Sequence, residues 1–196
     1  MKKNIIIIGS GGHACSLVDL IETTNKFKII GIICNKKKKG NNYLGYKILG
    51  NDSYLNNFKK KKPFIAFGFS LYKNLDLYEK KFLKYKKLGY SFPKIISPFA
   101  YVSKRVKLGE GTNIFHGAII NSSCVIGKGV TINSKTLIEH DTIIESFSHI
   151  STGCILNGGI KIDKKIFIGS GTVVKENIEI AKKKFIKIGS LIIKNL

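Results

Sequence analysis

Three consecutive residues, Glu139, His140 and Asp141, form the group best suited to chemistry in this chain of 196 residues. An imidazole takes up a proton near neutral pH, and a neighbouring carboxylate fixes its tautomer and raises its basicity. His140 lies two positions after Ile138, which the repeat described next sends inward, so we expect the imidazole to point outward. An outward histidine on a wall is by itself more often a surface residue, so its role depends on the elements that carry it.

The group lies within a repeat of six residues that runs from about residue 100 to 180. Every sixth residue of this repeat is aliphatic, and this position is called the beat here. A small or β-branched residue often stands two positions before the beat, and Gly, Asn or Asp often follows it. A period of six fits neither a helix nor an alternating strand. It fits stacked coils of short parallel strands around one core, and not a β-sandwich, whose turn signals come about every 8–12 residues. The aliphatic beat occupies Val102, Leu108, Ile114, Ile120, Ile126, Ile132, Ile138, Ile144, Ile150, Leu156, Ile162, Ile168, Val174 and Ile180.

Two sets of sequence segments in this repeat resemble a known family. Residues 106–111, 124–129 and 166–171 resemble the hexapeptide repeat of left-handed parallel β-helix acyltransferases. Residues 137–144 with 148–151 resemble, more specifically, the bacterial sugar acetyltransferases of the sialic acid O-acetyltransferase and UDP-4-amino-sugar N-acetyltransferase family. The resemblance covers nearly the whole chain. It implies an α/β N-terminal domain with a small Rossmann-like parallel sheet, followed by an all-β left-handed parallel β-helix.

The residues of the N-terminal part support an α/β domain independently. Residues 4–8 read as a buried parallel strand, residues 9–14 match the pattern G-x-G-x-x-A, and a helix follows to about residue 23. Such glycines let the backbone approach an anionic group at a helix N-terminus. A second strand at 27–34 is followed by asparagine and four lysines, and lacks the acidic residue that would hold the ribose of NAD. A phosphate-bearing ligand therefore fits better than NAD.

A third strand over 63–67 and an amphipathic helix over 71–88 complete this domain, which we place at residues 1–94, before a β-helix domain at 95–196. In the family that the chain resembles, the first domain binds the nucleotide sugar and the second binds acetyl-CoA. Gly68 fits a tight turn equally well. By resemblance, the substrate-binding residues are Gly11, Gly12, His13, Cys34, Asn35 and Gly68.

The same resemblance assigns roles in the β-helix. His140 is the general base, Asp141 its orienting carboxylate and Glu139 the alternate. No serine or cysteine nucleophile lies in this signature, so we expect direct transfer in a ternary complex without an acyl-enzyme. The family also implies a homotrimer with the acetyl-CoA cleft between neighbouring prisms. The positions matching the donor site are His149, Ser170, Ile188 and Gly189.

Composition restricts the partners. The formal net charge is +22, yet Arg105 is the only arginine, and the lysine runs lack interleaved aromatic residues. We therefore expect no specific nucleic-acid binding, while anionic ligands such as coenzyme A and nucleotide sugars gain from the charge. Cys124 and Cys154 occupy the small inward position and are read as core residues. Without a signal peptide or a long apolar run, we expect a cytoplasmic protein without disulfides or membrane insertion.

The sequence leaves three alternatives open. The glycine turn and neighbouring lysines suit a diphosphate, which favours N-acetylation of a UDP-linked 4-amino-4,6-dideoxy sugar in surface glycan biosynthesis over O-acetylation of a sialic-acid-type sugar. A zinc hydratase of the left-handed β-helix type would hold its metal on three histidines, here His116, His140 and His149. Their spacings do not resemble the pattern of those hydratases, so no metal is expected. A non-catalytic partner protein of a sugar-pathway enzyme would keep the fold without cleaving a thioester.

Overall fold

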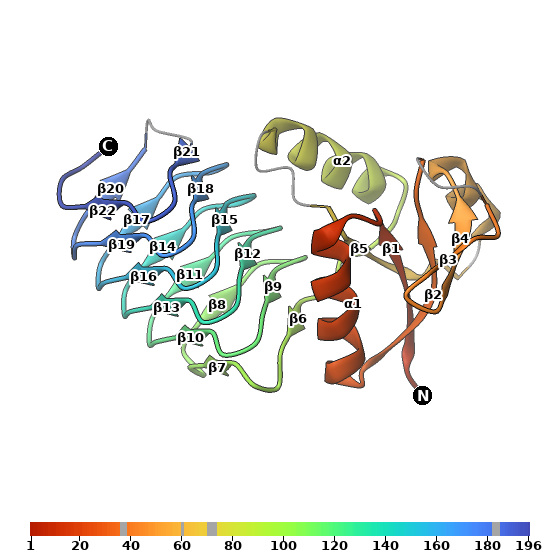
Figure 1. The fold of residues 1–196 in the computed structure, drawn as a ribbon, viewed down its shortest axis with the longest axis horizontal. Helices are drawn as coiled ribbons and strands as arrows, with labels where there is room; N and C mark the ends of the chain where they lie inside the picture. The colour runs from red at the N-terminus through yellow and green to blue at the C-terminus, as the bar shows by residue number, and fades with distance from the viewer. Residues whose placement is uncertain (36–38, 60, 70–73, 182–184) are drawn as a thin grey trace. The chain divides into compact units, whose positions relative to one another are not determined.

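The computed structural model describes residues 1–35, 39–59, 61–69, 74–181 and 185–196 (Figure 1). The chain folds into two compact units. The first contains Met1–Leu71 and Leu83–Pro93, and the second contains Tyr72–Phe82 and Lys94–Leu196. The helix at the boundary, α2 (Leu75–Lys87), therefore contributes to both units. The predicted domain limits, 1–94 and 95–196, place that helix wholly in the first domain and stay a prediction.

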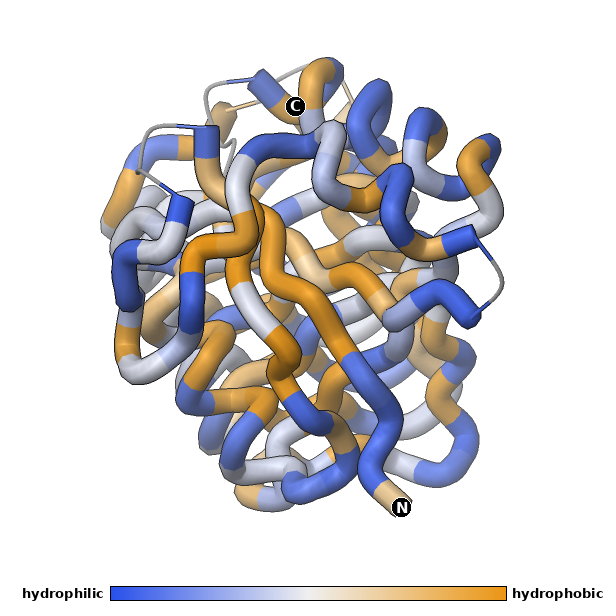
Figure 2. The backbone as a smooth tube through the Cα atoms, turned by 90° about the vertical axis from the view of Figure 1, so that its right-hand side faces the viewer, coloured by the Kyte–Doolittle hydropathy of each residue, from blue (hydrophilic) through white to orange (hydrophobic). Residues whose placement is uncertain are grey.

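The first unit is built on a five-stranded sheet in the order β3-β4-β2-β1-β5. All neighbours pair in parallel except the hairpin β3–β4. Strand β1, which lies between β2 and β5, contains four buried isoleucines, and the tube in Figure 2 turns from hydrophilic to hydrophobic along it from the N-terminus. The elements are β1 (Lys3–Ile8), α1 (Gly12–Thr24), β2 (Phe27–Ile33), β3 (Asn42–Tyr43), β4 (Tyr46–Gly50), the 3₁₀ helix η1 (Asp52–Asn57) and β5 (Phe64–Phe67).

Sequence patterns predicted β1, α1, β2 and β5 but missed the hairpin and η1. The hairpin turns on Leu44 and Gly45, both with positive φ, which is the two-residue turn typical of hairpins. A leucine at such a position gives no turn signal, so the pattern was not visible. Helix α2 begins at Leu75, and residues 71–73 of the predicted helix lie outside the described residues.

The second unit is the predicted left-handed parallel β-helix, whose strands are two residues long. They form three sheets, called walls here. Wall 1 holds β6 (Ile95–Ile96), β9 (Asn113–Ile114), β12 (Thr131–Ile132), β15 (His149–Ile150), β18 (Phe167–Ile168) and β21 (Phe185–Ile186). Wall 2 holds β7 (Tyr101–Val102), β10 (Ile119–Ile120), β13 (Leu137–Ile138), β16 (Ile155–Leu156), β19 (Val173–Val174) and β22 (Leu191–Ile192). Wall 3 holds β8 (Lys107–Leu108), β11 (Val125–Ile126), β14 (Ile143–Ile144), β17 (Lys161–Ile162) and β20 (Glu179–Ile180).

The six-residue beat explains this architecture. The second residue of each strand is the aliphatic beat residue, and from Ile114 onward every one of them belongs to one buried cluster. Strands pair with the strand one coil further on, so that Ile119 opposes Leu137 and Ile120 opposes Ile138. The left-handed position of most described corners lies three residues after the beat, where φ is between 57° and 73° and glycine is the commonest residue. The Gly, Asn and Asp that directly follow the beat, such as Asn121 and Gly127, do not have positive φ, so the predicted left-handed position was two residues too early. The fold class predicted from the sequence is confirmed.

The small inward residues do more than fill the core. Their hydroxyl or thiol groups donate to a backbone carbonyl fifteen positions further on. Burial raises the pKa of the Cys154 thiol to about 11 and also raises that of Cys124, so both keep the proton that they donate. The donors are Thr112, Cys124, Thr136, Thr142, Ser148, Cys154 and Thr172.

The first half of α2 packs on the corner between walls 3 and 1. The ring of Phe147 lies 5.3 Å from that of Phe82 and 6.3 Å from that of Tyr78. One coil further on, the Lys165 ammonium forms ion pairs with Asp76 at 2.7 Å and with Glu79. Aromatic packing and charge therefore hold this part of α2 against the solenoid. No helix among the described residues is long and apolar enough to cross a membrane.

Candidate active site

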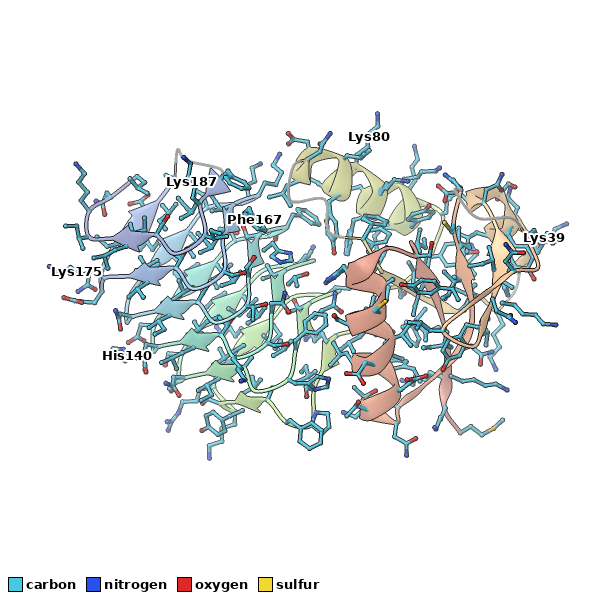
Figure 3. All side chains as sticks on the ribbon, in the orientation of Figure 1. Lys39, Lys80, His140, Phe167, Lys175 and Lys187 are labelled. Atoms are coloured by element: carbon cyan, nitrogen blue, oxygen red, sulfur yellow. The ribbon has the colours of Figure 1, made fainter. Side chains whose placement is uncertain are left out.

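His140 lies at the corner between β13 and β14, which joins walls 2 and 3. The inward Ile138 ends the preceding strand, so the next residues leave the core and form the turn. The His140 side chain is 63 % exposed and projects from the outer edge of the solenoid (Figure 3). The outward direction predicted from the sequence is therefore the one observed.

Asp141 is bonded to His140 in a way that defines the imidazole tautomer. The distance from His140 Nδ1 to Asp141 Oδ2 is 2.8 Å. A carboxylate accepts, so Nδ1 carries the proton and Nε2 is left as a proton acceptor. Asp141 has φ +60°, a conformation that Asp tolerates better than most residues, and its N–H donates to Ser122 O at 3.1 Å. The corner thus holds both the backbone and the carboxylate of Asp141.

Glu139 is engaged elsewhere. Its Oε2 accepts from Asn121 Nδ2 at 2.7 Å, one coil before. Of the two carboxylates beside His140, the one in hydrogen-bond contact with the imidazole is that of Asp141. The geometry therefore favours Asp141 over Glu139 as the orienting group.

Gly158, which sequence reasoning missed, lies directly under the imidazole. A Cβ on Gly158 would stand 2.7 Å from Cε1 and 2.8 Å from Nε2 of His140. The signal was present in the repeat, because Gly158 follows His140 by eighteen positions, one full coil. Without the three-dimensional register, however, it reads as one more corner glycine.

The four residues predicted to contact the acyl donor lie on wall 1 and on the corner between walls 1 and 2. His149 begins β15 on wall 1, is only 8 % exposed, and has its ring 5.3 Å from that of Phe167. Ser170 and Ile188–Gly189 occupy successive levels of the corner, where Gly189 N donates to Ser170 O at 2.8 Å. Ile188 and Gly189 are exposed, and so is Ser170.

One chain does not bring the base and these donor residues together. His140 lies at the edge of wall 2 that borders wall 3, whereas Ser170 and Gly189 lie at the opposite edge, bordering wall 1. Within one chain, the predicted base and the predicted donor residues therefore lie on two different corners of the prism.

The predicted substrate residues of the first unit fall into two groups. Gly11 and Gly12 are exposed with open space beside them, and Gly11 precedes α1 without a side-chain cap. The Gly11 carbonyl accepts from Tyr43 Oη at 2.9 Å, so the missed hairpin fixes this turn. Burial lowers the pKa of His13 to about 4, and its imidazole is neutral at pH 7.

Cys34 and Asn35 line a different feature, a pocket of about 500 Å³. Its other polar lining residues include Lys39, Asn51 and Ser53, so it offers amides, a hydroxyl and a cation. Gly68 is buried, and a Cβ there would stand 2.7 Å from Ile7 and 2.8 Å from Ala14. Close packing of β5 against β1 and α1 therefore accounts for this glycine.

The three histidines of the zinc alternative do not converge within one chain. His116 lies at the corner between walls 1 and 2, where its Nδ1 is 2.7 Å from Ser97 Oγ. His149 is on wall 1, and His140 is at the corner between walls 2 and 3. Among the described residues there is no group of three or more His, Cys, Asp or Glu side chains that could hold a metal ion.

A family model matches the N-terminal part of the chain. Residues 4–74 match the family model described as the PglD N-terminal domain. No curated protein matches the chain. The predicted resemblance is supported in the N-terminal domain by this match and in the fold of the whole chain by the solved structures that follow.

Particular solved structures share the fold over almost the whole chain. A histidine-to-asparagine mutant of perosamine N-acetyltransferase from Caulobacter crescentus, in complex with CoA and GDP-perosamine, has a TM-score of 0.90 at 24% identity, covering 98% of this chain and 90% of that one. The acetyltransferase domain of PglB from Neisseria gonorrhoeae, in complex with acetyl coenzyme A, gives 0.89 at 22%, covering 100% and 93%. WeeI from Acinetobacter baumannii gives 0.75 at 19%, covering 97% and 96%. At these identities the likeness establishes the fold.

Proposed function

We propose that this protein is an acetyl-CoA-dependent sugar N-acetyltransferase of the cytoplasm, acting on the amino group of a UDP-linked 4-amino-4,6-dideoxy sugar. The observation that carries the proposal is the 2.8 Å contact between His140 Nδ1 and Asp141 Oδ2, on an exposed corner of a left-handed β-helix. Solved proteins of this fold include sugar acetyltransferases with CoA or acetyl coenzyme A bound.

The chemistry follows from the tautomer. Nε2 of His140 takes a proton from the sugar amine as the nitrogen attacks the thioester carbonyl. The tetrahedral intermediate then collapses, the carbon–sulfur bond breaks, and the coenzyme A thiolate receives a proton from the imidazolium. Asp141 stabilises that imidazolium and keeps Nδ1 protonated throughout.

Wall 2 supports a homotrimer that completes the site. Its outward column is apolar at every strand, whereas wall 3 carries Lys107, Lys161 and Glu179 at the equivalent positions. Burying this column against a neighbouring chain is favourable, and it would bring His140 of one chain toward Ser170 and Gly189 of the next. The column consists of Tyr101, Ile119, Leu137, Ile155, Val173 and Leu191.

The acceptor is assigned to the first unit. The open turn at Gly11 and Gly12 suits a diphosphate, and the pocket of Cys34 and Asn35 offers amide groups for the remainder of the nucleotide. A UDP-linked sugar remains our proposal. The Caulobacter protein is solved with GDP-perosamine, so a GDP-linked amino sugar is the direct competitor in any test.

The test measures thiol release from acetyl-CoA with UDP-linked amino sugars, GDP-linked amino sugars and free sialic-acid-type sugars. We expect turnover with the UDP-linked amine. Turnover confined to a GDP-linked amine would correct the nucleotide, and turnover confined to a free hydroxyl sugar would establish O-acetylation. Sugar binding without thiol release for any acceptor would favour the non-catalytic partner protein.

A further inference from the structure

We infer that Gly158 is a positioning residue for His140. Because Gly158 has no side chain, the imidazole can lie against it in the orientation that bonds Asp141, and this space beside Gly158 is called the seat here. The inference rests on the proposed function, in which His140 is the base. It adds a residue whose side-chain position acts through the base.

The contact distances show that the seat is fully occupied. A Cβ on Gly158 would approach Cε1 at 2.7 Å, Nε2 at 2.8 Å and Nδ1 at 3.3 Å of the His140 ring. Carbon contacts are optimal at about 3.5–4.0 Å, so the ring and a methyl group cannot share this space. The imidazole would have to move.

The backbone at this corner leaves little room for adjustment. Gly159 N donates to His140 O at 2.9 Å, and Asn177 N donates to Gly158 O at 2.9 Å. The coil of Gly158 is therefore tied to the coil before it and to the coil after it. A bulkier residue at Gly158 would displace the exposed imidazole more readily than it would separate the coils.

Backbone conformation does not explain this glycine. Gly158 is not among the residues with positive φ, whereas its neighbour Gly159 has φ +70°. The equivalent first corner positions, one coil before and one coil after His140 and Gly158, are Ser122 and Glu176, which carry side chains. The corner itself therefore accepts a side chain, and the contact with His140 is what distinguishes position 158.

A shift of the ring has a direct chemical consequence. The bond from Nδ1 to Asp141 Oδ2 is made by an imidazole whose Cε1 and Nε2 atoms lie next to Gly158. If the ring tilts away, Nδ1 loses the carboxylate, the tautomer is no longer fixed, and Nε2 is no longer reliably the acceptor. Small misplacements of a catalytic group cost up to about 100-fold in rate.

The experiment compares Gly158→Ala with Glu176→Ala, a matched change at the same corner one coil further on. For Gly158→Ala we expect kcat to fall about 10- to 100-fold, with both KM values within about twofold of wild type and an unchanged melting temperature. In the free protein, the imidazole ¹⁵N chemical shifts of His140 should change from a single tautomer in the wild type to a mixture. Glu176→Ala should leave rates and shifts unaltered.

The two readouts separate this inference from the proposed function. If Gly158→Ala keeps wild-type kcat and the His140 ¹⁵N shifts, the seat has no positioning role even though the enzyme works. If wild-type protein releases no thiol with any acceptor while the ¹⁵N shifts still respond to Gly158→Ala, the seat is real and the proposed function is wrong. A large loss of melting temperature in Gly158→Ala would show a purely structural role and would also overturn the inference.

Discussion

At the scale of single residues, the pair of His140 and Asp141 contributes orientation and little stability. Both side chains are 63 % exposed, and exposed ion pairs are worth at most about 1 kcal/mol. Their removal should therefore affect chemistry without affecting the fold. This separation makes the two residues favourable targets for testing the mechanism.

His140→Ala is expected to lower kcat by about 10²- to 10⁴-fold, since a positioned base is lost. Asp141→Asn should cost less, because the amide keeps the positive-φ turn while removing only the charge that stabilises the imidazolium. Steady-state kinetics at saturating donor and acceptor, with melting temperatures as the folding control, provide the measurement. Wild-type turnover in His140→Ala would show that another group is the base.

His13 makes stability depend on pH. Burial lowers its pKa from 6.5 to about 4, so between these values the unfolded chain binds more protons than the folded one. The stabilisation is present above pH 6.5 and is lost as pH falls toward 4, with an upper bound of about 3 kcal/mol. His13→Gln should show a smaller drop in melting temperature between pH 7 and pH 4.5 than wild type. Equal drops in both proteins would mean that His13 is accessible to protons when folded.

At the scale of elements, the six-residue beat predicted nearly every strand of the β-helix, because each strand has one obligatory inward position. The beat could not show which buried hydroxyl or thiol donates a hydrogen bond to which corner carbonyl. Thr136, for example, donates to Ser151 O, a partner set by the height of a coil and not by sequence proximity. The hairpin β3–β4 was missed because it is held by Tyr43 and a turn at Leu44, neither of which has a periodic signal.

Thr136→Val should lower the stability of the β-helix by about 1–3 kcal/mol, because it removes a donor from the buried Ser151 carbonyl while keeping side-chain volume. Thr152→Val, at an exposed corner position, is the matched control and should be nearly neutral. Denaturant unfolding of both variants measures the difference. Similar midpoints would show that the corner hydrogen bonds add nothing to hydrophobic packing.

At the scale of the whole molecule, the sequence indicated the residues of the candidate site but not their separation. His140 and Ser170 were both assigned by one resemblance, yet they lie at opposite edges of wall 2. Successive strands lie on walls 1, 2 and 3 in turn, so the spacing in the sequence shows which edge a corner occupies only once each strand has been assigned to its wall. The resemblance already implied a cleft between neighbouring chains, but only the fold shows that the two corners are separate within one chain.

Ile155→Asp should convert the expected trimer into monomers, because it places a charge in the apolar column of wall 2. Val125→Asp on wall 3 is the matched control, since Val125 and Ile155 are both 39 % exposed. Light scattering with size-exclusion chromatography gives the masses, and turnover should fall with assembly in Ile155→Asp alone. Identical masses for wild type and Ile155→Asp would exclude wall 2 as the interface.

The coil repeat also limits how such a chain can change in length. Each coil adds one strand spacing of about 4.8 Å along the axis, and on wall 2 the corner of Ser170 precedes β19, two strands beyond β13. Distances between His140 and the donor corner therefore change only in whole steps. An insertion of eighteen residues between them would lengthen the distance between His140 and the corner of Ser170 by one strand spacing and would keep every corner on its own edge. An insertion of six or twelve residues would keep the isoleucines inward but would move every later strand to another wall, and a length that is not a multiple of six would carry them to the surface. Variants that bind acyl donors of different length are therefore expected to differ by whole coils.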